Sequence, residues 1–444
     1  MPVAEIQAIP GFNVRVDSPG VGSHLQDHPE AVRQLAYANL VVVNKTDAAD
    51  PVTPGHDGSG CAAAKPDQSR SERTRSFDPA DFPRPTGREE EWRFTPVDRL
   101  GAFYRDETTG ASLEVGTDIP EGVTASTISV QEWRALGVPA PADRAAAVAA
   151  ARSGGVTVVD IPRETTLAQP VRLTLGGESD TLVHGHLMVR AGRFSRGTVV
   201  LEHTGSADHA EVVTILAEDG ADLTVVTTQE WADGTLHVGQ HDVVVGRDAR
   251  VRHVAVSLGG SLVRLDVNAT YAGPGGSFEG LGVYLADDGQ HLEHRLFVDH
   301  EAPRCQSNVE YKGALLGETA HTVWIGDVLI RAAAEGTETY EINRNLVLTD
   351  GARADSVPNL EIETGEIAGA GHASATGRFD DEQLFYLQAR GIPADEARRL
   401  VLRGFFAAIV DRIGIDEIEE RLMGAIDAEL GHVAPAGTNE EDDA

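Results

Sequence analysis

Histidine is the side chain of this sequence with the widest scope for metal and proton chemistry, because a neutral imidazole binds transition metals and titrates near pH 7. One histidine, His372, lies in the segment AGAGHASATG, between a series of short apolar runs and a helical region. The segment holds no second histidine or cysteine. A lone histidine is more often structural than functional, so its immediate surroundings leave its role open.

A second group of possible ligands lies in QHLEHRLFVDHEAPRC, which contains His291, His294, His300 and Cys305. Imidazole and thiolate suit zinc or iron, but ligands supplied by one short loop usually come in tight pairs. If 291–298 is a strand, His291 and His294 point to opposite faces. We therefore expect surface and turn histidines on successive coils here, with Cys305 as a small buried residue.

His184 and His186 form an H-x-H pair on one face of a strand, as in metal-binding cupins. The cupin pattern needs a glutamate a few residues later, and the following LMVRAGR contains none. We therefore reject this metal site.

The elements that must position these histidines are short β-branched runs closed by Gly, Asp or Asn about every dozen residues. The runs are 156–161, 171–175, 181–189, 197–203, 210–216, 223–229, 237–246, 250–260, 261–273 and 277–286. A total of 47 glycines suits many tight corners. The pattern indicates a repetitive β architecture, either a sandwich or a parallel β-helix.

The regions before the β-rich runs differ from them in composition. Residues 1–84 are rich in Pro, Gly, Ser, Asp and Thr and predict a largely disordered leader. Residues 85–154 predict a small α/β lobe, with one short helix over 87–100 that packs Trp92 and Phe94 inward, and helices at 130–137 and 140–153.

After Arg378 the pattern is helical. DDEQLFYLQARG begins with acidic residues and ends at Gly391, and Pro393 starts an amphipathic second helix. A third helix is predicted from Asp416 to Leu430, so 379–432 forms a helical lobe, and 433–444 is an acidic tail.

Composition excludes several classes of function. Lys+Arg 37 against Asp+Glu 70 gives a net charge of −33, which disfavours binding to nucleic acid or to anionic membranes. Two cysteines cannot build a disulfide framework or a four-thiolate cluster site. The sequence shows no signal peptide, no membrane-length apolar run and no nucleotide-binding P-loop. We expect a cytoplasmic protein.

This order of parts resembles the SufB/SufD family of scaffold subunits for iron–sulfur cluster assembly. Four segments carry the resemblance: GTETYEINRNLVLTDGARADSVPNLEI, GAGHASATGRFDDEQLFYLQARGI, REEEWRF and SNVEYKGALLGETAHTVWIGDVLI. It covers roughly residues 76–430. It implies a mainly β fold, with a right-handed parallel β-helix over 155–378 between the N-terminal α/β lobe and the C-terminal helical lobe.

The resemblance also implies a site. In the SufD branch, the histidine that matches His372 is thought to face SufB where the nascent cluster forms, so His372 is the candidate cluster-assembly and metal residue. The family often carries a cysteine two residues earlier, where this sequence has Ala370, so sulfur handling would fall to SufB. SufB-like chains tend to have a cysteine at the position of Leu387, which favours the SufD branch.

By the same resemblance the chain is a non-catalytic subunit of a SufBCD complex. It would pair with a SufB-like paralogue, and its helical lobe would dock a SufC-like ATPase through Tyr386, Arg390 and Arg403. No cofactor would be bound tightly. Iron or a cluster would be held transiently at the SufB interface, and ATP would bind to SufC.

The alternative is an acidic β-helix hydrolase or lyase acting on polysaccharide, with paired carboxylates drawn from Asp350, Asp355, Glu361 and Glu363. We expect instead that the two aspartates flank turns and that the two glutamates share a solvated strand face.

Overall fold

The computed structural model describes residues 73–378 and 381–432. The predicted acidic tail and most of the predicted leader, residues 1–72, lie outside the described residues. The final part of the leader, 73–84, is described and contains a single turn of 3-10 helix, η2 (Pro79–Asp81).

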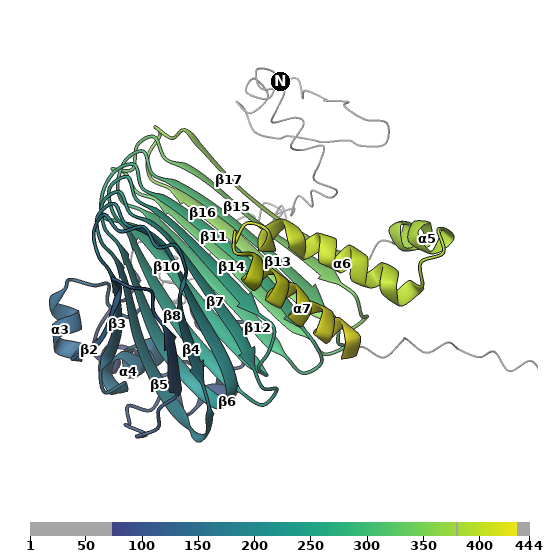
Figure 1. The fold of residues 1–444 in the computed structure, drawn as a ribbon, viewed down its shortest axis with the longest axis horizontal. Helices are drawn as coiled ribbons and strands as arrows, with labels where there is room; N and C mark the ends of the chain where they lie inside the picture. Colours follow the sequence, from purple (N-terminus) through teal and green to yellow (C-terminus); the bar gives the residue numbers. More distant parts are fainter. Residues whose placement is uncertain (1–72, 379–380, 433–444) are drawn as a thin grey trace, which may run out of the picture. The chain divides into compact units, whose positions relative to one another are not determined.

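Residues 156–378 form a parallel β-solenoid whose strands stack turn upon turn (Figure 1). Its strands are β3 (Val156–Ile161), β4 (Val171–Gly176), β5 (Glu178–Ala191), β6 (Arg196–Ala217), β7 (Asp222–Trp231), β8 (Leu236–Val245), β9 (Arg250–Ser257), β10 (Leu262–Tyr271), β11 (Ser277–Ala286), β12 (His291–His300), β13 (Gln306–Leu315), β14 (His321–Ile330), β15 (Glu338–Val347), β16 (Arg353–Ile362) and β17 (Gly369–Arg378). The expected mainly β fold, with a parallel β-helix at its centre, is confirmed.

The strands form two facing sheets. In the first sheet, hydrogen-bonded neighbours follow the order β4, β6, β7, β9, β11, β13, β15 and β17. In the second sheet, the order is β3, β5, β6, β8, β10, β12, β14 and β16. Because consecutive turns are parallel and in register, a residue lies beside the residue about 30 positions further along the chain.

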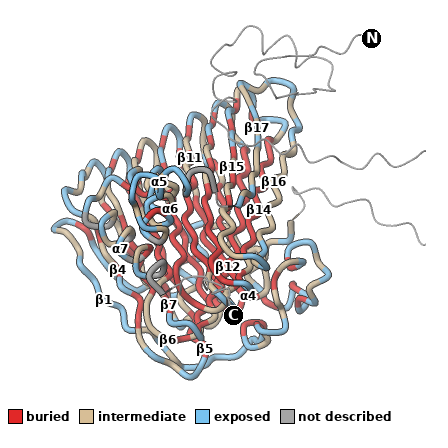
Figure 2. Tube along the Cα trace, turned by 90° about the vertical axis from the view of Figure 1, so that its right-hand side faces the viewer, coloured by how far each residue is buried: buried red, intermediate tan, exposed pale blue. Residues whose placement is uncertain are grey.

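Side chains alternate between the interior of the solenoid and its outer faces. The interior holds a continuous apolar core that includes Val199, Val225, Leu265, Leu296 and Trp324. Figure 2 shows the buried residues following the strands through the middle of the stack. One prediction was wrong in detail: the runs 197–203 and 210–216 are a single strand, β6, that pairs in both sheets.

The N-terminal part covers the outer face of the second sheet. Strands β1 (Glu114–Asp118) and β2 (Thr124–Ile128) pair antiparallel with β4 and β3. Helices α3 (Val130–Ala135) and α4 (Arg144–Arg152) occur where helices are predicted. Their apolar side chains pack with those on β5, β6 and β8.

The predicted single helix over 87–100 is wrong. The chain forms two separate 3-10 turns, η3 (Glu90–Trp92) and η4 (Val97–Leu100). Pro96 explains the break, because its ring disfavours helical geometry at the preceding residue and it has no N–H to donate. Trp92 is buried as predicted, whereas Phe94 is only half-buried beneath the Arg93 guanidinium.

The C-terminal helices are α5 (Asp381–Ala389), α6 (Ala394–Val410) and α7 (Asp416–His432). Helices α6 and α7 lie along the outer face of the first sheet, and α5 lies beyond them (Figure 1). Phe406 is fully buried there, and the Lys312 ammonium donates to the Phe405 carbonyl at 2.9 Å. Arg412 adds an ion pair to Glu310 at 2.9 Å. The helical lobe is therefore attached by apolar packing and by partly buried polar contacts.

No helix among residues 73–378 and 381–432 combines the length and the apolar character needed to cross a membrane.

The attachment of the helical lobe can be tested with Phe406→Ala. Because the ring is fully buried, we expect the free energy of unfolding to fall by about 3–5 kcal/mol in chemical denaturation. Amide exchange in α6 should accelerate as well. Phe385→Ala is the matched control, since Phe385 is 72% exposed, and it should cost less than about 0.5 kcal/mol. Equal effects of the two substitutions would contradict the packing described.

Candidate functional site

His372 lies on β17, the last strand of the first sheet, directly beside Glu341 of β15. Its Nδ1 atom is 3.9 Å from Glu341 Oε1. The His372 side chain is 42% exposed, whereas that of Glu341 is 2% exposed. The in-register stacking of β17 on β15 therefore places an accessible imidazole above a buried carboxyl group.

The carboxyl group of Glu341 is buried without hydrogen bonds from the described residues to offset its loss of hydration. Neither of its oxygens has a hydrogen-bond partner among the described residues. Burial, reinforced by the negative charge of Asp327, raises the pKa of Glu341 to about 8. The backbone N–H of Asn359 acts in the opposite direction, but it does not reach hydrogen-bond geometry. Glu341 is therefore a neutral acid at pH 7.

The room for this carboxyl group comes from Gly326 on the facing sheet. A Cβ atom at Gly326 would lie 2.3 Å from Glu341 Oε2 and 2.4 Å from the Trp324 ring. Gly326 and Trp324 belong to the segment 307–330, which carries part of the family resemblance. That segment thus forms the wall opposite the candidate site.

Chemically, the pair can accept a cation. The imidazole of His372 offers a nitrogen ligand, and Glu341 offers an oxygen ligand once it loses its proton. A metal ion bound there would replace that proton, so binding would release one proton. Strand β17 supplies no thiolate beside this pair, because it contains no cysteine and has Ala370 two residues before His372.

The same end of the solenoid has open strand edges. Within the described residues, β16 pairs only with β14, and β17 pairs only with β15. Figure 2 shows less burial along β16 and β17 than along the strands before them. Tyr340 and Ile362 expose 45% and 42% of their surface. Unpaired N–H and C=O groups with apolar neighbours can add strands from another chain.

The predicted docking residues lie at two places on the helical lobe. The Arg390 guanidinium stacks over the Tyr386 ring at 4.7 Å, and Tyr386 is 56% exposed at the end of α5. Phe385 beside it is 72% exposed. Arg403 lies elsewhere, where it pairs with Asp427 across α6 and α7. Their role in docking stays a prediction.

The expectation that the histidines of 291–300 lie on the surface or in turns was wrong. His291, His294 and His300 all lie on β12, and each is at most 4% exposed. As expected, His291 and His294 point to opposite faces: His291 contacts Glu293, whereas His294 bonds Ser257 and stacks on Tyr284 inside the solenoid. Cys305 is free and buried, as predicted. The group does not converge.

The remaining candidates are also separated. His186 packs against the Trp133 ring at 4.3 Å, and neither His184 nitrogen has a hydrogen-bond partner among the described residues. The carboxylates form separate contacts rather than one pair. Asp355, which lies on β16 rather than beside a turn, pairs with His321 at 2.8 Å, and Asp350 pairs with Arg378 at 2.8 Å.

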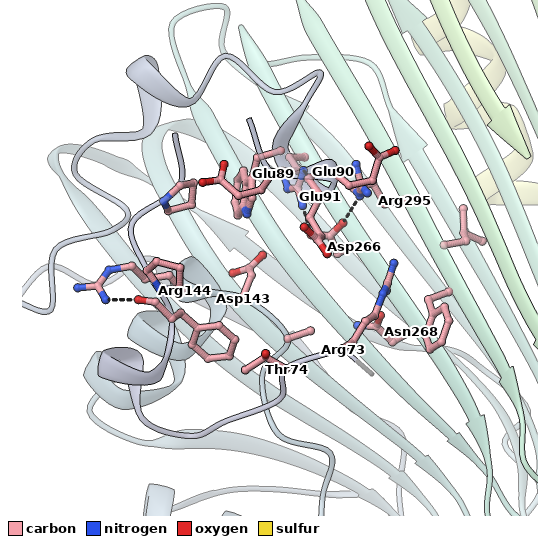
Figure 3. A pocket seen from close by; sticks show the side chains of 18 residues that line it. Arg73, Thr74, Glu89, Glu90, Glu91, Asp143, Arg144, Asp266, Asn268 and Arg295 are labelled. Carbon is pink, nitrogen blue, oxygen red and sulfur yellow. Dashed lines mark hydrogen bonds and ion pairs between the residues drawn. The ribbon is translucent and has the colours of Figure 1, made fainter. Parts of the chain in front are cut away.

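A cleft of about 760 Å³ opens on the outer face of β10 and β12, against the N-terminal part (Figure 3). Its charges are largely paired with one another: Asp266 binds Arg264 at 2.8 Å and Arg295 at 3.5 Å. Asp143 accepts a hydrogen bond from Ala146 N and caps α4. Its lining includes no described residue of β15 or β17. We assign these contacts to holding the N-terminal part on the sheet.

Sequence reasoning missed one constellation entirely. His203, His209, Glu211 and His237 bring their ligand atoms within 4.8 Å of one another inside the solenoid, and we call them the histidine–glutamate cluster. The sequence offered only a weak signal. His209 and Glu211 are two residues apart on one strand and so share a face, and His237 is the register partner of His209 on the next turn.

Comparison with known proteins agrees with the family resemblance seen in the sequence. The family model described as "SUF system FeS cluster assembly, SufBD core domain" matches residues 173–405. An "Iron-sulfur cluster assembly SufBD family protein" of Mycobacterium tuberculosis is 51% identical over 364 residues, which cover 80% of this chain and 91% of that protein. The "Iron-sulfur cluster assembly protein SufD" of Bacillus subtilis is 25% identical over 301 residues, covering 66% of this chain and 68% of that protein.

The state of Glu341 can be tested through the pH dependence of stability. In the unfolded chain this carboxyl ionises near 4.5, whereas in the folded chain it keeps its proton up to about pH 8. The folded state therefore binds more protons in this interval, and its stability falls as the pH rises. Glu341→Gln should remove this loss, which is on the order of 4 kcal/mol.

Chemical denaturation of both proteins between pH 5 and about pH 8.5 measures the difference. Glu338→Gln, at an exposed carboxyl group on the same strand, is the control and should keep the wild-type slope. A Glu341→Gln variant with the wild-type slope would show that Glu341 ionises normally.

Proposed function

The chain belongs to the SufBD family of iron–sulfur cluster assembly proteins, and we propose that it is a non-catalytic scaffold subunit that pairs with a SufB-like paralogue and docks a SufC-like ATPase. The observation that carries the proposal is the position of His372, accessible above a buried neutral carboxyl at the open end of the solenoid. Similarity to the two SufD proteins of Bacillus subtilis and Escherichia coli supports the SufD branch.

Pairing with a SufB-like chain is supported by the open edges. The parallel strands β16 and β17 leave backbone groups unpaired on their outer sides within the described residues. A second parallel solenoid offers the same spacing between strands, so the two stacks can continue one another. The apolar surfaces of Tyr340 and Ile362 would be buried in such a contact.

In this arrangement His372 faces the partner at the seam. Iron or a nascent cluster is the cargo, and the His372 imidazole binds it transiently as a nitrogen ligand. Glu341 contributes through its proton: an arriving cation favours the ionised carboxyl, and the released proton leaves a local negative charge that stabilises the cation. The thiolate and sulfide chemistry falls to the partner, because Ala370 provides no thiol on this side.

The helical lobe supplies the mechanical connection. Tyr386 and the neighbouring Phe385 are exposed on α5, and Arg390 follows directly after this helix. Helix α5 is the part of the lobe that lies beyond the solenoid. Helices α6 and α7 are fixed to the first sheet by Phe406 and Arg412. Movement of a SufC-like ATPase bound at the lobe would therefore move the solenoid as a unit, and closure of two such ATPase subunits on ATP would shift the seam at His372.

The central test is His372→Ala in the reconstituted complex with the SufB-like and SufC-like proteins. We expect cluster content, measured as iron and acid-labile sulfide, to fall by about tenfold, because even residues that only support a metal ligand alter binding by that much. The complex should still assemble on size-exclusion chromatography, since the imidazole is 42% exposed and supports no core contact.

His321→Ala is the matched control. This histidine lies on β14 of the same stack but pairs with Asp355 on the outer face. It should leave the cluster content unchanged. Full cluster content in His372→Ala would remove the site from the proposal, and failure of the wild-type chain to bind a SufB-like protein would remove the scaffold function itself.

Docking of the ATPase is tested with the double substitution Tyr386→Ala and Arg390→Glu. The exposed pair is expected to form the contact, so co-purification of the SufC-like ATPase should be lost while the SufB-like protein is retained. Arg193→Glu reverses another exposed arginine, on the solenoid, whose side chain is 62% exposed, and should leave both partners bound. Retention of the ATPase by the double variant would place the docking surface elsewhere.

A further inference from the structure

The histidine–glutamate cluster lies inside the solenoid, remote in the fold from the strand that carries His372. His203, His209 and Glu211 come from β6, and His237 comes from β8. All four residues are at most 1% exposed. The three imidazole rings of the cluster surround the Glu211 carboxylate, with ring centroids 5.1 to 6.0 Å apart, and His241 of β8 adds a fourth imidazole, whose Nε2 lies 3.3 Å from Glu211 Oε1.

Two glycines make the space for these rings. Glu211 lies in register with Gly185 on β5 and with Gly239 on β8, so no side chain flanks it on either neighbouring strand. A Cβ atom at Gly185 would lie 2.5 Å from His209 Cε1, and one at Gly239 would lie 3.2 Å from His237 Nε2. The neighbouring strands therefore carry no side chain at the positions where the imidazoles converge.

The hydrogen bonds of His203 fix its proton on the wrong nitrogen for a bond to Glu211. His203 Nδ1 is 3.0 Å from the carbonyl oxygen of Thr228, which can only accept, so Nδ1 carries the proton. In the neutral ring Nε2 is then a lone pair, and it lies 3.1 Å from Glu211 Oε1 and 3.2 Å from Oε2. Two lone pairs at this distance repel unless a positive charge lies between them.

A histidine that donates one N–H to a backbone carbonyl while its other nitrogen faces a carboxylate has the arrangement of a metal ligand. The distances agree. His209 Nε2 is 3.3 Å from Glu211 Oε2, and His203 Nε2 is 3.1 Å from Oε1. Two ligands bound at 2.1 Å to a tetrahedral ion lie about 3.4 Å apart. Direct hydrogen bonds from a charged imidazole to a carboxylate are shorter, about 2.7–2.9 Å.

Two nitrogen atoms of the cluster are also left over. Neither His209 Nδ1 nor His237 Nε2 has a hydrogen-bond partner among the described residues, although both are buried. Buried polar atoms are almost always paired, so these two nitrogen atoms are exceptions to that rule. Imidazoles and a carboxylate converge in this space, and this ligand set suits zinc or ferrous iron.

We propose that His203, His209 and Glu211 hold a divalent transition metal ion, Zn²⁺ or Fe²⁺, as a structural centre inside the solenoid. His203 and His209 bind through Nε2, and Glu211 binds through its carboxylate. His237 is a positioning residue: Trp231 donates to His237 Nδ1 at 3.0 Å, which places the ring proton on Nε2 and directs it toward Glu211. All three ligands come from β6, so the ion ties the part of β6 in the first sheet to the part in the second sheet.

The test begins with the full-length wild-type chain, because the site is enclosed and its loading is coupled to folding. The chain is unfolded in guanidinium with a chelator, refolded anaerobically with Zn²⁺ or Fe²⁺, desalted, and analysed for metal by mass spectrometry. We expect about one ion per chain and a higher unfolding temperature than for the chain refolded without metal.

Two substitutions, Glu211→Gln and His203→Asn, should abolish retention of the ion. His294→Gln is the matched control, because that histidine is as deeply buried but bonds Ser257 instead, and it should keep the ion. His372→Ala should also keep it, which separates this site from the proposed cluster-assembly site.

A measurement on the wild type alone covers the case in which the variants do not fold. X-ray absorption at the zinc edge should show only nitrogen and oxygen ligands at about 2.0–2.1 Å, with the scattering pattern of two imidazoles. Refolded wild-type chain that retains no metal, or a sulfur-containing shell, overturns the proposal. In the first case the cluster is a hydrogen-bonded group in which His203 is doubly protonated.

Discussion

In-register stacking of parallel strands is the constraint on which the rest of this structure depends. Inward positions of successive turns lie side by side, so an inward side chain meets the equivalent residues of the turns before and after it. A polar residue inside such a stack must therefore be balanced by residues about 30 positions away in the sequence. The last turn differs, because its inward residues have a neighbour on one side only. His372 is such a residue, and its exposure follows directly from its place on β17.

Two buried glutamates show how strongly the neighbours decide. Burial disfavours the charged form of Glu211 too, but His203 and the adjacent imidazoles outweigh it and hold the pKa of Glu211 well below its usual range. Glu341 has no comparable partner, and burial keeps it protonated. The same solenoid thus carries a permanent buried anion inside the stack and a neutral acid at its open end. A bound cation would be held by Glu211 and its neighbouring imidazoles, whereas a cation near Glu341 would favour the ionised form of that carboxyl group.

Much of the fold could be predicted from the sequence, since β-branched runs closed by turn residues mark each strand, and the helical segments begin and end at recognisable residues such as Gly391 and Pro393. Periodicity alone could not distinguish a sandwich from a solenoid, and the family resemblance decided it. His372 was identified from its flanking sequence, but Glu341 was not, because their contact depends on register. The same reason hid the histidine–glutamate cluster. His291, His294 and His300 were expected at the surface, because the sequence does not reveal partners such as Ser257 and Tyr284 on other turns.

The claim that His372 contacts the cargo is tested most directly by magnetic resonance on the assembled complex. This chain alone is labelled with ¹⁵N-histidine, the SufB-like and SufC-like partners are left unlabelled, and the assembled cluster is reduced to its paramagnetic state. Electron spin-echo modulation should then show a ¹⁵N coupling of the strength of a directly bound imidazole, and the coupling should vanish when His372 is replaced by Ala. A cluster that forms in the complex without any ¹⁵N coupling from this chain would contradict the account.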